Sequence, residues 1–368
     1  MSSQDDRLRL ARLALGFSQG DLARRAGVTR QAISGIESGR WSPSLEVALT
    51  LSRVLGVSVD DLFGAEKEPA PVEFGLVTPP RHSGVSTRLA VAEVAGTTLG
   101  FPLDAGHSFT PGFLPASAEY LAAEVPAARA TEATTFSARR LADPLPSLVI
   151  AGCDPALSLL AGPLARSRPA LQLVWRCCGS KRARELLSAG KVHVAGVHRD
   201  VGEPVAVSEH TEVVGFASWW EGLAVSPRHV GEVKDLRDVA RLGLRLANRE
   251  PGSEARRLLD RELGRLRIRP QEIEGYETAH PAHLLAAAAV DAGAADVAVV
   301  TEPSALAFGL EFHAWREETS ELHISKDLMG SLGVRTLLRV LGRGEIARQL
   351  RSLEGYDPAV CGKLFTPG

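Results

Sequence analysis

The spacing of apolar and polar positions changes character along the chain. Over residues 4–63, apolar side chains recur at helical intervals in short stretches that are separated by capping residues and glycines, which predicts five short helices. Ser18 is placed to begin the second helix with Asp21 three residues later, as in a capping box, and Thr29 is placed to begin the third helix after Gly27. The connection between these two helices is about four residues long and contains a glycine, as a helix-turn-helix requires.

The pattern weakens after residue 66. The segment 67–146 begins with charged residues around Pro69 and Pro71, a composition that favours an extended connector. Residues 87–104 contain two short strand-like runs with a glycine-containing turn between them, whereas the Ala-rich stretch 117–143 is ambiguous. We therefore expect a linker followed by a small strand-containing subdomain.

From residue 147 to residue 368 compact apolar runs alternate with helical stretches. The strand-like runs are 146–153, 171–179, 192–198, 242–250, 273–279 and 295–300, and the helical stretches are 154–165, 180–190, 253–266, 281–293 and 303–309. This alternation predicts α/β layers with mainly parallel strands. In such sheets, ligands bind beyond the carboxyl ends of the strands, where helices begin.

The composition bounds the class of protein. A chain of 368 residues is long enough for two or three domains, and its 45% hydrophobic and 23% charged residues are ordinary for a globular protein. The net charge is only −2, and residues 1–64 are nearly neutral, so any DNA binding must come from local placement of charge. The division we predict is a helix-turn-helix domain at 1–66, a linker and subdomain at 67–146, and an α/β domain at 147–368.

Compartment and redox state follow from a few segments. The chain begins with acidic residues where a signal peptide would be basic, and the longest apolar run, 284–300, is interrupted by Asp291 and Asp296, so we expect neither secretion nor a membrane span. Four cysteines in this length do not make a disulfide framework. The expectation is a cytoplasmic protein.

The stretch 17–63 resembles the Cro/repressor-type (XRE) helix-turn-helix family. The shared pattern is Gln-x-x-Leu-Ala, Gly-Val, Ile-Ser-x-x-Glu-x-Gly, a proline and Ala-x-x-Leu. The resemblance implies double-stranded DNA as a partner and implies the following set of DNA-binding residues: Gln19, Thr29, Arg30, Gln31, Ser34 and Arg40. The alternative is a solvated helix face in a protein-interaction module.

The chemistry of these side chains suits the implied roles. Gln19 and the start of the second helix would meet phosphate, while Arg30 and Gln31 can each form paired hydrogen bonds to base edges in the major groove. Arg40 would reach the DNA backbone beyond the recognition helix. Gly35 stands where relatives often have a longer, base-reading side chain, so the readout is expected to be short of contacts.

The segment from 147 to about 358 resembles the periplasmic-binding-protein-like (type 2) domain that is found in some cytoplasmic regulators and beside molybdenum-cofactor enzymes. The resemblance is carried by "IAGCDPALSLL", "AGKVHVAGVH", "WWEGLAVSPRH", "LANREPGSEARRLLD" and "AGAADVAVVTEPSALAFGLEF". It implies two α/β lobes that are joined by crossing segments, with a small-molecule ligand in the cleft. The candidate ligand-binding residues are Cys153, Asp154, Ser180, His198, Asn248, Arg249, Gly252, Ser253, Thr278 and Glu302.

One loop departs from the family pattern. Relatives commonly have Gly-Ser-Gly-Thr-Arg where this chain has Gly252-Ser253-Glu254-Ala255-Arg256. Glu254 places negative charge at a helix N-terminus that an oxyanion would use, which disfavours molybdate or tungstate and leaves a zwitterion, a cofactor precursor, a larger organic molecule or a degenerate cleft. The same carboxylate also stabilises a bare helix end, so simple capping is the alternative.

Metal and catalytic sites are not indicated by spacing. Cys177 and Cys178 are adjacent in an apolar run, so we expect them to be buried and inert. His280 and His283 are the nearest approach to a ligand pair, but without a third ligand in view a surface or capping role is favoured over zinc. Trp219-Trp220 fit either a ring-stacking site or the core. We expect no metal and no cofactor.

These features favour a ligand-responsive transcription factor. The head would bind a palindromic operator as a homodimer, and the body would close on a small molecule, either an anion or a compound related to the molybdenum cofactor. The alternatives are a DNA-bound scaffold that recruits a protein partner, and an enzyme that uses Asp154, His198 or Glu302 as acid or base. No nucleophile–histidine–acid set stands out in the sequence, which disfavours the enzyme.

Overall fold

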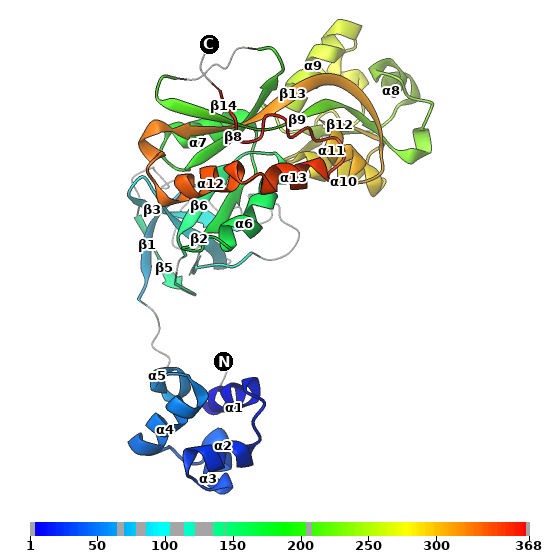
Figure 1. The fold of residues 1–368 in the computed structure, drawn as a ribbon. Coiled ribbons are helices and arrows are strands. Elements are labelled where there is room, and N and C mark those ends of the chain that lie inside the picture. Colours follow the sequence, from blue (N-terminus) through cyan, green and yellow to red (C-terminus); the bar gives the residue numbers. More distant parts are fainter. Residues whose placement is uncertain are drawn as a thin grey trace. The chain divides into compact units, whose positions relative to one another are not determined.

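The computed structural model separates into two compact units, Met1–Pro69 and Ala70–Gly368 (Figure 1). It describes residues 4–64, 70–78, 86–103, 114–121, 135–143, 145–203 and 208–365. The boundaries predicted at 66 and 146 stay predictions.

The first unit is a bundle of five helices, as predicted. They are α1 (Gln4–Ala14), α2 (Gln19–Ala26), α3 (Arg30–Glu37), α4 (Leu45–Leu55) and α5 (Val59–Phe63). Ser18 caps α2 in a capping box with Asp21, Gly27 ends α2 in the left-handed conformation, and Thr29 caps α3. Ile33 and Leu51 lie at the centre of the bundle with no exposed surface. Local capping signals and helical periodicity therefore determine this unit.

The second unit begins with a small closed barrel. Its strands are β1 (Val72–Leu76), β2 (Ser86–Val94), β3 (Thr97–Pro102), β4 (Ala118–Leu121) and β5 (Thr135–Arg140), in the order β1-β3-β2-β4-β5. The predicted hairpin within 87–104 is confirmed as β2 and β3, which turn at Ala95 and Gly96, both with positive φ. Residues 65–69 of the predicted connector and 122–134 of the Ala-rich stretch lie outside the described residues.

The body is a nine-stranded sheet shared by two α/β lobes, with strand order β11-β10-β12-β9-β13-β8-β6-β7 and β14 paired to β9. The first lobe contains β6 (Ser147–Ala151), β7 (Gln172–Arg176), β8 (Val194–Asp200), α6 (Ala161–Ala165), α7 (Ser180–Ser188), α12 (Leu332–Gly342) and α13 (Glu345–Arg351). The second lobe contains β10 (Leu246–Arg249), β11 (Ala279–His280), β12 (Val297–Thr301), α8 (Leu236–Leu242), α9 (Glu254–Leu266), α10 (His283–Asp291) and α11 (Glu302–Leu306). Short 3₁₀ turns and a last strand complete it: η2 (Pro155–Leu160), η3 (Pro227–His229), η4 (Pro270–Glu272), η5 (Lys326–Leu328) and β14 (Leu364–Phe365).

Two long strands pass from one lobe to the other. β9 (Thr211–Val225) and β13 (Glu311–Ser325) are each 15 residues long and pair with each other along most of their length. β13 pairs with β8 of the first lobe, whereas β9 pairs with β12 of the second. Both pairings are antiparallel, as is that of β14 with β9, whereas β6 pairs in parallel with β7 and β8, and β10 pairs in parallel with β11 and β12. The family resemblance implied crossing segments between the lobes, but the apolar pattern did not predict these two strands.

Apolar layers on both sides of the sheet hold each lobe together. In the first lobe, Ile150 and Leu337 belong to a core beneath α12 and α13, while Val149 and Ala195 face α7 and the barrel. The second lobe has comparable layers on its two sides. The strand expected over 273–279 is wrong for 273–278, which lie outside any strand, and only Ala279–His280 pair with β10. Within the described part of the chain, no helix has the length and apolar character of a membrane span.

Candidate functional site

The third helix of the head exposes the polar side chains that the sequence singled out. Thr29, Arg30 and Gln31 are exposed, and Ser34 is half-buried. The Thr29 hydroxyl accepts a hydrogen bond of 3.1 Å from the backbone N–H of Ala32, so it fixes the start of α3. The helix therefore presents a polar N-terminal end to solvent, which is the arrangement that base recognition needs.

Gln19 is tied to a buried ion pair beneath that helix. Glu37 accepts hydrogen bonds from the Arg12 Nε at 2.6 Å and from the Gln19 side-chain amide at 2.9 Å. The side chains of Arg12 and Glu37 are 8% and 5% exposed. This contact joins α1, α2 and α3, and the phosphate contact expected of Gln19 stays a prediction.

Gly35 has a packing reason that the sequence did not reveal. A Cβ at this position would lie 2.5 Å from the ring of Trp41, so the ring covers the helix where a longer side chain would stand. Arg40, next to that tryptophan, is exposed and donates from Nε to the Ser38 hydroxyl at 2.9 Å. Gly35, where few base contacts are expected, is therefore packed against the ring of Trp41.

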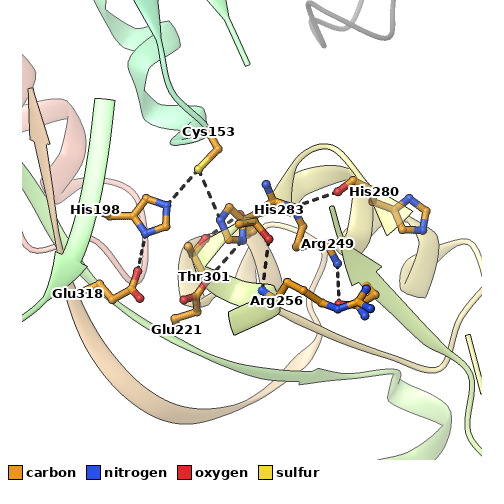
Figure 2. Close-up of polar contacts among 12 residues, drawn as sticks. Cys153, His198, Glu221, Arg249, Arg256, His280, His283, Thr301 and Glu318 are labelled. Atoms are coloured by element: carbon orange, nitrogen blue, oxygen red, sulfur yellow. Dashed lines mark hydrogen bonds and ion pairs between the residues drawn. The ribbon is translucent and has the colours of Figure 1, made fainter. Parts of the chain in front are cut away.

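The centre of the body brings together one thiol and two imidazoles. The Cys153 Sγ lies 3.1 Å from the His198 Nε2 and 3.9 Å from the His283 Nε2 (Figure 2). Cys153 follows β6 and His198 lies on β8, both in the first lobe, whereas His283 begins α10 in the second. All three residues are at most 3% exposed. The site is therefore assembled from both lobes.

A carboxylate of a crossing strand lies beside each imidazole. The His198 Nδ1 is 2.6 Å from a Glu318 oxygen on β13, and the His283 Nδ1 is 3.8 Å from a Glu221 oxygen on β9 (Figure 2). Strand register explains the arrangement, because Glu318 is opposite Trp219, and Glu221 is two residues further along β9, so the side chains point to one face. Both carboxylates are buried, at 0% and 1% exposure.

Burial and neighbouring charge shift the pKa values of these groups in different directions. Burial and the charge of Glu318 raise the pKa of Glu221 well above its usual range. Burial opposes a charge on His198, but Cys153 and Glu318 outweigh it and raise the pKa of that imidazole. Burial together with the Arg249 charge lowers the pKa of His283. The two imidazoles are thus in unlike environments, one favouring the cation and the other the neutral ring.

Asp154, predicted as a ligand-binding residue, accepts three hydrogen bonds within the protein. It accepts hydrogen bonds from the Tyr356 hydroxyl at 2.8 Å, the Ser320 hydroxyl at 3.1 Å and the Ala156 N–H at 2.9 Å. Burial raises the pKa of its carboxyl group. Trp219 lies between this network and the imidazoles, with its ring centroid 5.8 Å from those of both His198 and Tyr356.

Three predicted residues of the second lobe are also buried and bonded within the protein. The Asn248 side chain donates to the Tyr276 carbonyl at 2.7 Å and accepts from the backbone N–H of Arg249 at 2.8 Å. The Arg249 guanidinium pairs with Glu250 at 2.9 Å, and Ser253 caps α9. These contacts shape the wall of the second lobe.

The remaining predicted residues differ in burial and contacts. The Ser180 hydroxyl accepts from the His198 backbone N–H at 3.3 Å, Gly252 and Thr278 are exposed, and Glu302 begins α11 half-buried. Burial raises the pKa of Glu302. The ligand contacts expected of these residues stay predictions. Glu254 is in the first turn of α9 and pairs with Arg257, so its capping role has a structural basis.

Three expectations about cysteine and histidine need correction. His283 is 1% exposed and not at the surface, and its partners are 130 and 85 residues away in sequence rather than at local spacing. Cys177 and Cys178 are half-buried rather than buried. A thiol–imidazole–carboxylate set, Cys153, His198 and Glu318, does exist, although none stood out in the sequence. Glu221 and Glu318 were missed, and the signal for Glu221 was an acid within an apolar strand.

Two family models match separate parts of the chain. Residues 8–62 match the helix-turn-helix family model, and residues 161–342 match the PBP superfamily domain model. An HTH-type transcriptional regulator of Methanothermobacter thermautotrophicus is 44% identical over 64 residues, which is 17% of this chain and 93% of that protein. The chain is a helix-turn-helix transcriptional regulator with a PBP superfamily domain.

Relatives that match other parts of the chain are more distant. The uncharacterized protein YvgK of Bacillus subtilis is 29% identical over 144 residues, so the match covers 39% of this regulator and about half, 46%, of YvgK. The crystal structure of full-length CbnR with its target DNA covers 55% of this chain and 72% of that chain, with 20% identity and a TM-score of 0.39.

Proposed function

We propose that this regulator binds operator DNA through α3 and binds a small ligand between the lobes of its body. The observation that carries the proposal is the division of polar side chains on α3. Arg30 and Gln31 are exposed at the start of the helix, while Ile33 and Ile36 are in the core. A helix that is fixed by an apolar face and offers paired donors on the other face suits the major groove.

The body supports a sensing role because its buried polar centre is made by two lobes. Cys153 and His198 come from the first lobe and His283 from the second, so a ligand held by all three has different contacts when the lobes separate. A ligand shifts an equilibrium only as far as its affinities for the two forms differ. We propose that the two forms place a pair of heads differently on a palindromic operator, whose half-sites are about 34 Å apart.

Selection from a random duplex library with the full-length protein tests the DNA-binding half. We expect a defined sequence to be enriched, and we expect Arg30→Ala to lose roughly 1–3 kcal/mol and to relax the preference at one position. Arg53→Ala is the matched control, because it removes the same charge from an exposed position on α4. Failure to enrich any sequence would contradict the proposal, and equal loss on every sequence would assign Arg30 to phosphate.

The remaining expectations stand as proposals. The regulator is proposed to act as a homodimer, to work in the cytoplasm and to catalyse no reaction. Lobe closure on a ligand would be visible in solution as a change in the hydrogen exchange of β9 and β13, the strands that join the lobes. An unchanged exchange of both strands at saturating ligand would argue against closure.

A further inference from the structure

We propose that Cys153, His198 and His283 bind a transition-metal ion of the zinc class at the interface between the two lobes. The inference deepens the proposed function, because the ion would then be the ligand to which the regulator responds. Thiolate and imidazole donors favour zinc, cobalt and copper, whereas magnesium and calcium prefer oxygen ligands. The donor set therefore specifies the class of ion.

The distances between the donor atoms fit such an ion. Zn–S bonds of about 2.3 Å and Zn–N bonds of about 2.0–2.1 Å place sulfur and nitrogen about 3.6 Å apart at a tetrahedral angle. The Cys153 Sγ is 3.1 Å from one imidazole Nε2 and 3.9 Å from the other. All three donor atoms lie within 4.8 Å of one another. A small adjustment of side chains brings them to bonding distance.

The groups behind the imidazoles point to the same conclusion. Histidines that bind metals usually donate their second ring N–H to a carboxylate, which fixes the tautomer and the ring orientation. Here both Nε2 atoms face the thiol, and the Nδ1 atoms face Glu318 at 2.6 Å and Glu221 at 3.8 Å. Each imidazole therefore has a carboxylate on its far side, at hydrogen-bonding distance for His198 and beyond it for His283.

Unsatisfied polar atoms mark the place where a cation is needed. Among the described residues, the two Glu221 side-chain oxygens and the His283 Nδ1 are buried but have no hydrogen-bond partner. A metal on the Nε2 fixes the proton of His283 on Nδ1, from which it can donate to Glu221. The ion also brings positive charge to a buried site that holds the Glu318 carboxylate and, once the metal is bound, the Cys153 thiolate.

A cysteine nucleophile is the main rival for this geometry, since Cys153, His198 and Glu318 have the order of a catalytic set. A nucleophile needs an open face toward its substrate. Cys153 is 3% exposed, and a second imidazole, His283, stands 3.9 Å from its sulfur. That second imidazole has a role in a metal site and none in thiol activation.

Cobalt titration of the full-length, tag-free, reduced and chelator-treated protein tests the site. We expect one Co²⁺ per chain, visible d–d bands, and a sulfur-to-cobalt charge-transfer band in the near ultraviolet that Zn²⁺ abolishes by displacement. Cys153→Ser should lose the charge-transfer band and His283→Gln should weaken binding strongly. Cys361→Ser and His280→Gln are the matched controls and should bind as the wild type does.

Glu318→Gln adds a readout that a purely structural defect would not give. We expect it to keep the charge-transfer band while its affinity for Co²⁺ falls by roughly 10–100-fold, because the orienting partner of His198 is weakened. Circular dichroism of every variant checks that it is folded. Absence of stoichiometric cobalt binding by the wild type, or an unchanged charge-transfer band in folded Cys153→Ser, would overturn the metal site.

A separate arm distinguishes the metal site from the proposed function. The duplex selected from the random library is titrated with the metal-free protein and with the zinc-loaded protein, and we expect at least a 5-fold difference in affinity, the lower end of allosteric coupling. If no duplex is selected, the proposed function fails while the cobalt titration still decides the site. If zinc binds but leaves duplex affinity unchanged, the ion is not the regulatory ligand.

Discussion

The head and the body treat polar side chains in opposite ways. In the described part of the head, the charged side chains are exposed or half-exposed apart from the pair Arg12 and Glu37, whereas the body buries Glu221, Glu318 and Arg249 at 1% exposure or less. A surface that meets a large polyanion must present its donors, but a site for a small ligand must enclose them. The head therefore has its candidate binding side chains on the surface, whereas the body has them in the interior.

Breaking the buried pair of the head should give the largest effect. Arg12→Ala leaves Glu37 buried without its ion-pair partner, and removal of one member of such a pair costs about 3–5 kcal/mol. We expect most of the stability of the head to be lost and DNA binding to fail. Hydrogen exchange of peptides from 4–63 in the full chain measures this, with the exposed Arg9→Ala as control.

The double variant Arg12→Leu/Glu37→Leu sharpens the interpretation. Since a buried ion pair can often be replaced by apolar residues at little cost, we expect most of the stability to return. If the single variant Arg12→Ala were as protected from exchange as the wild type, the pair would have no structural role in the head.

The next largest effect is expected from acid, which should lower the stability of the body through a histidine that the head lacks. The head contains no histidine, and burial lowers the pKa of His193 in the body to about 4. Between pH 6.5 and 4 the unfolded chain binds this proton and the folded chain does not, so the free energy of unfolding falls as pH falls, by about 3 kcal/mol at pH 4 and below. Above pH 6.5 the contribution is constant.

His193→Asn tests this assignment, because an amide oxygen can still accept from the Val149 N–H, which now donates to the His193 Nδ1 at 3.0 Å. Denaturant unfolding at a series of pH values should show a shallower acid dependence of the body in the variant than in the wild type. Parallel curves for the two proteins between pH 6.5 and 4 would refute it.

The smallest expected effect lies at the start of α3. Thr29→Ala removes the cap that accepts from Ala32, which should cost about 1 kcal/mol of head stability. The same change should leave the unfolding of the body unaffected, since Thr29 belongs to the other unit. Thr29→Ser, which keeps the hydroxyl, is the control, and an equal loss in both variants would exclude the cap as the cause.

The head could be predicted in detail because its determinants are local. Ser18 with Asp21, Gly27 and Thr29 act within one turn of their own helix, so a short window of sequence contains the relevant physics. The ring of Trp41 over Gly35 could not be foreseen, because it depends on the path of the chain after the helix. Packing across a turn is the first level at which sequence reasoning fails here.

In the body, sequence reasoning fails at a second level, which is the contact between residues far apart in the chain. Apolar runs predicted β6, β7 and β8, and the end of two of these runs led to Cys153 and His198, which the structure brings together. The crossing strand β13 was missed because it mixes charged and apolar residues, whereas β9 was missed although it is largely apolar. Spacing rules for metals look for near neighbours, while His283 meets Cys153 from 130 residues away, so only the assembled lobes reveal the cluster.

The aromatic ring of Trp219 gives the centre its own optical reporter. Its indole is 3% exposed, and the ring centroid lies 5.8 Å from that of the His198 imidazole. A change of charge on the imidazole therefore perturbs the fluorescence emission of Trp219. The chain has five tryptophans, and comparison with Trp219→Phe isolates this one signal. Occupancy of the interior can thus be followed by intrinsic fluorescence, without labelling the protein or the DNA.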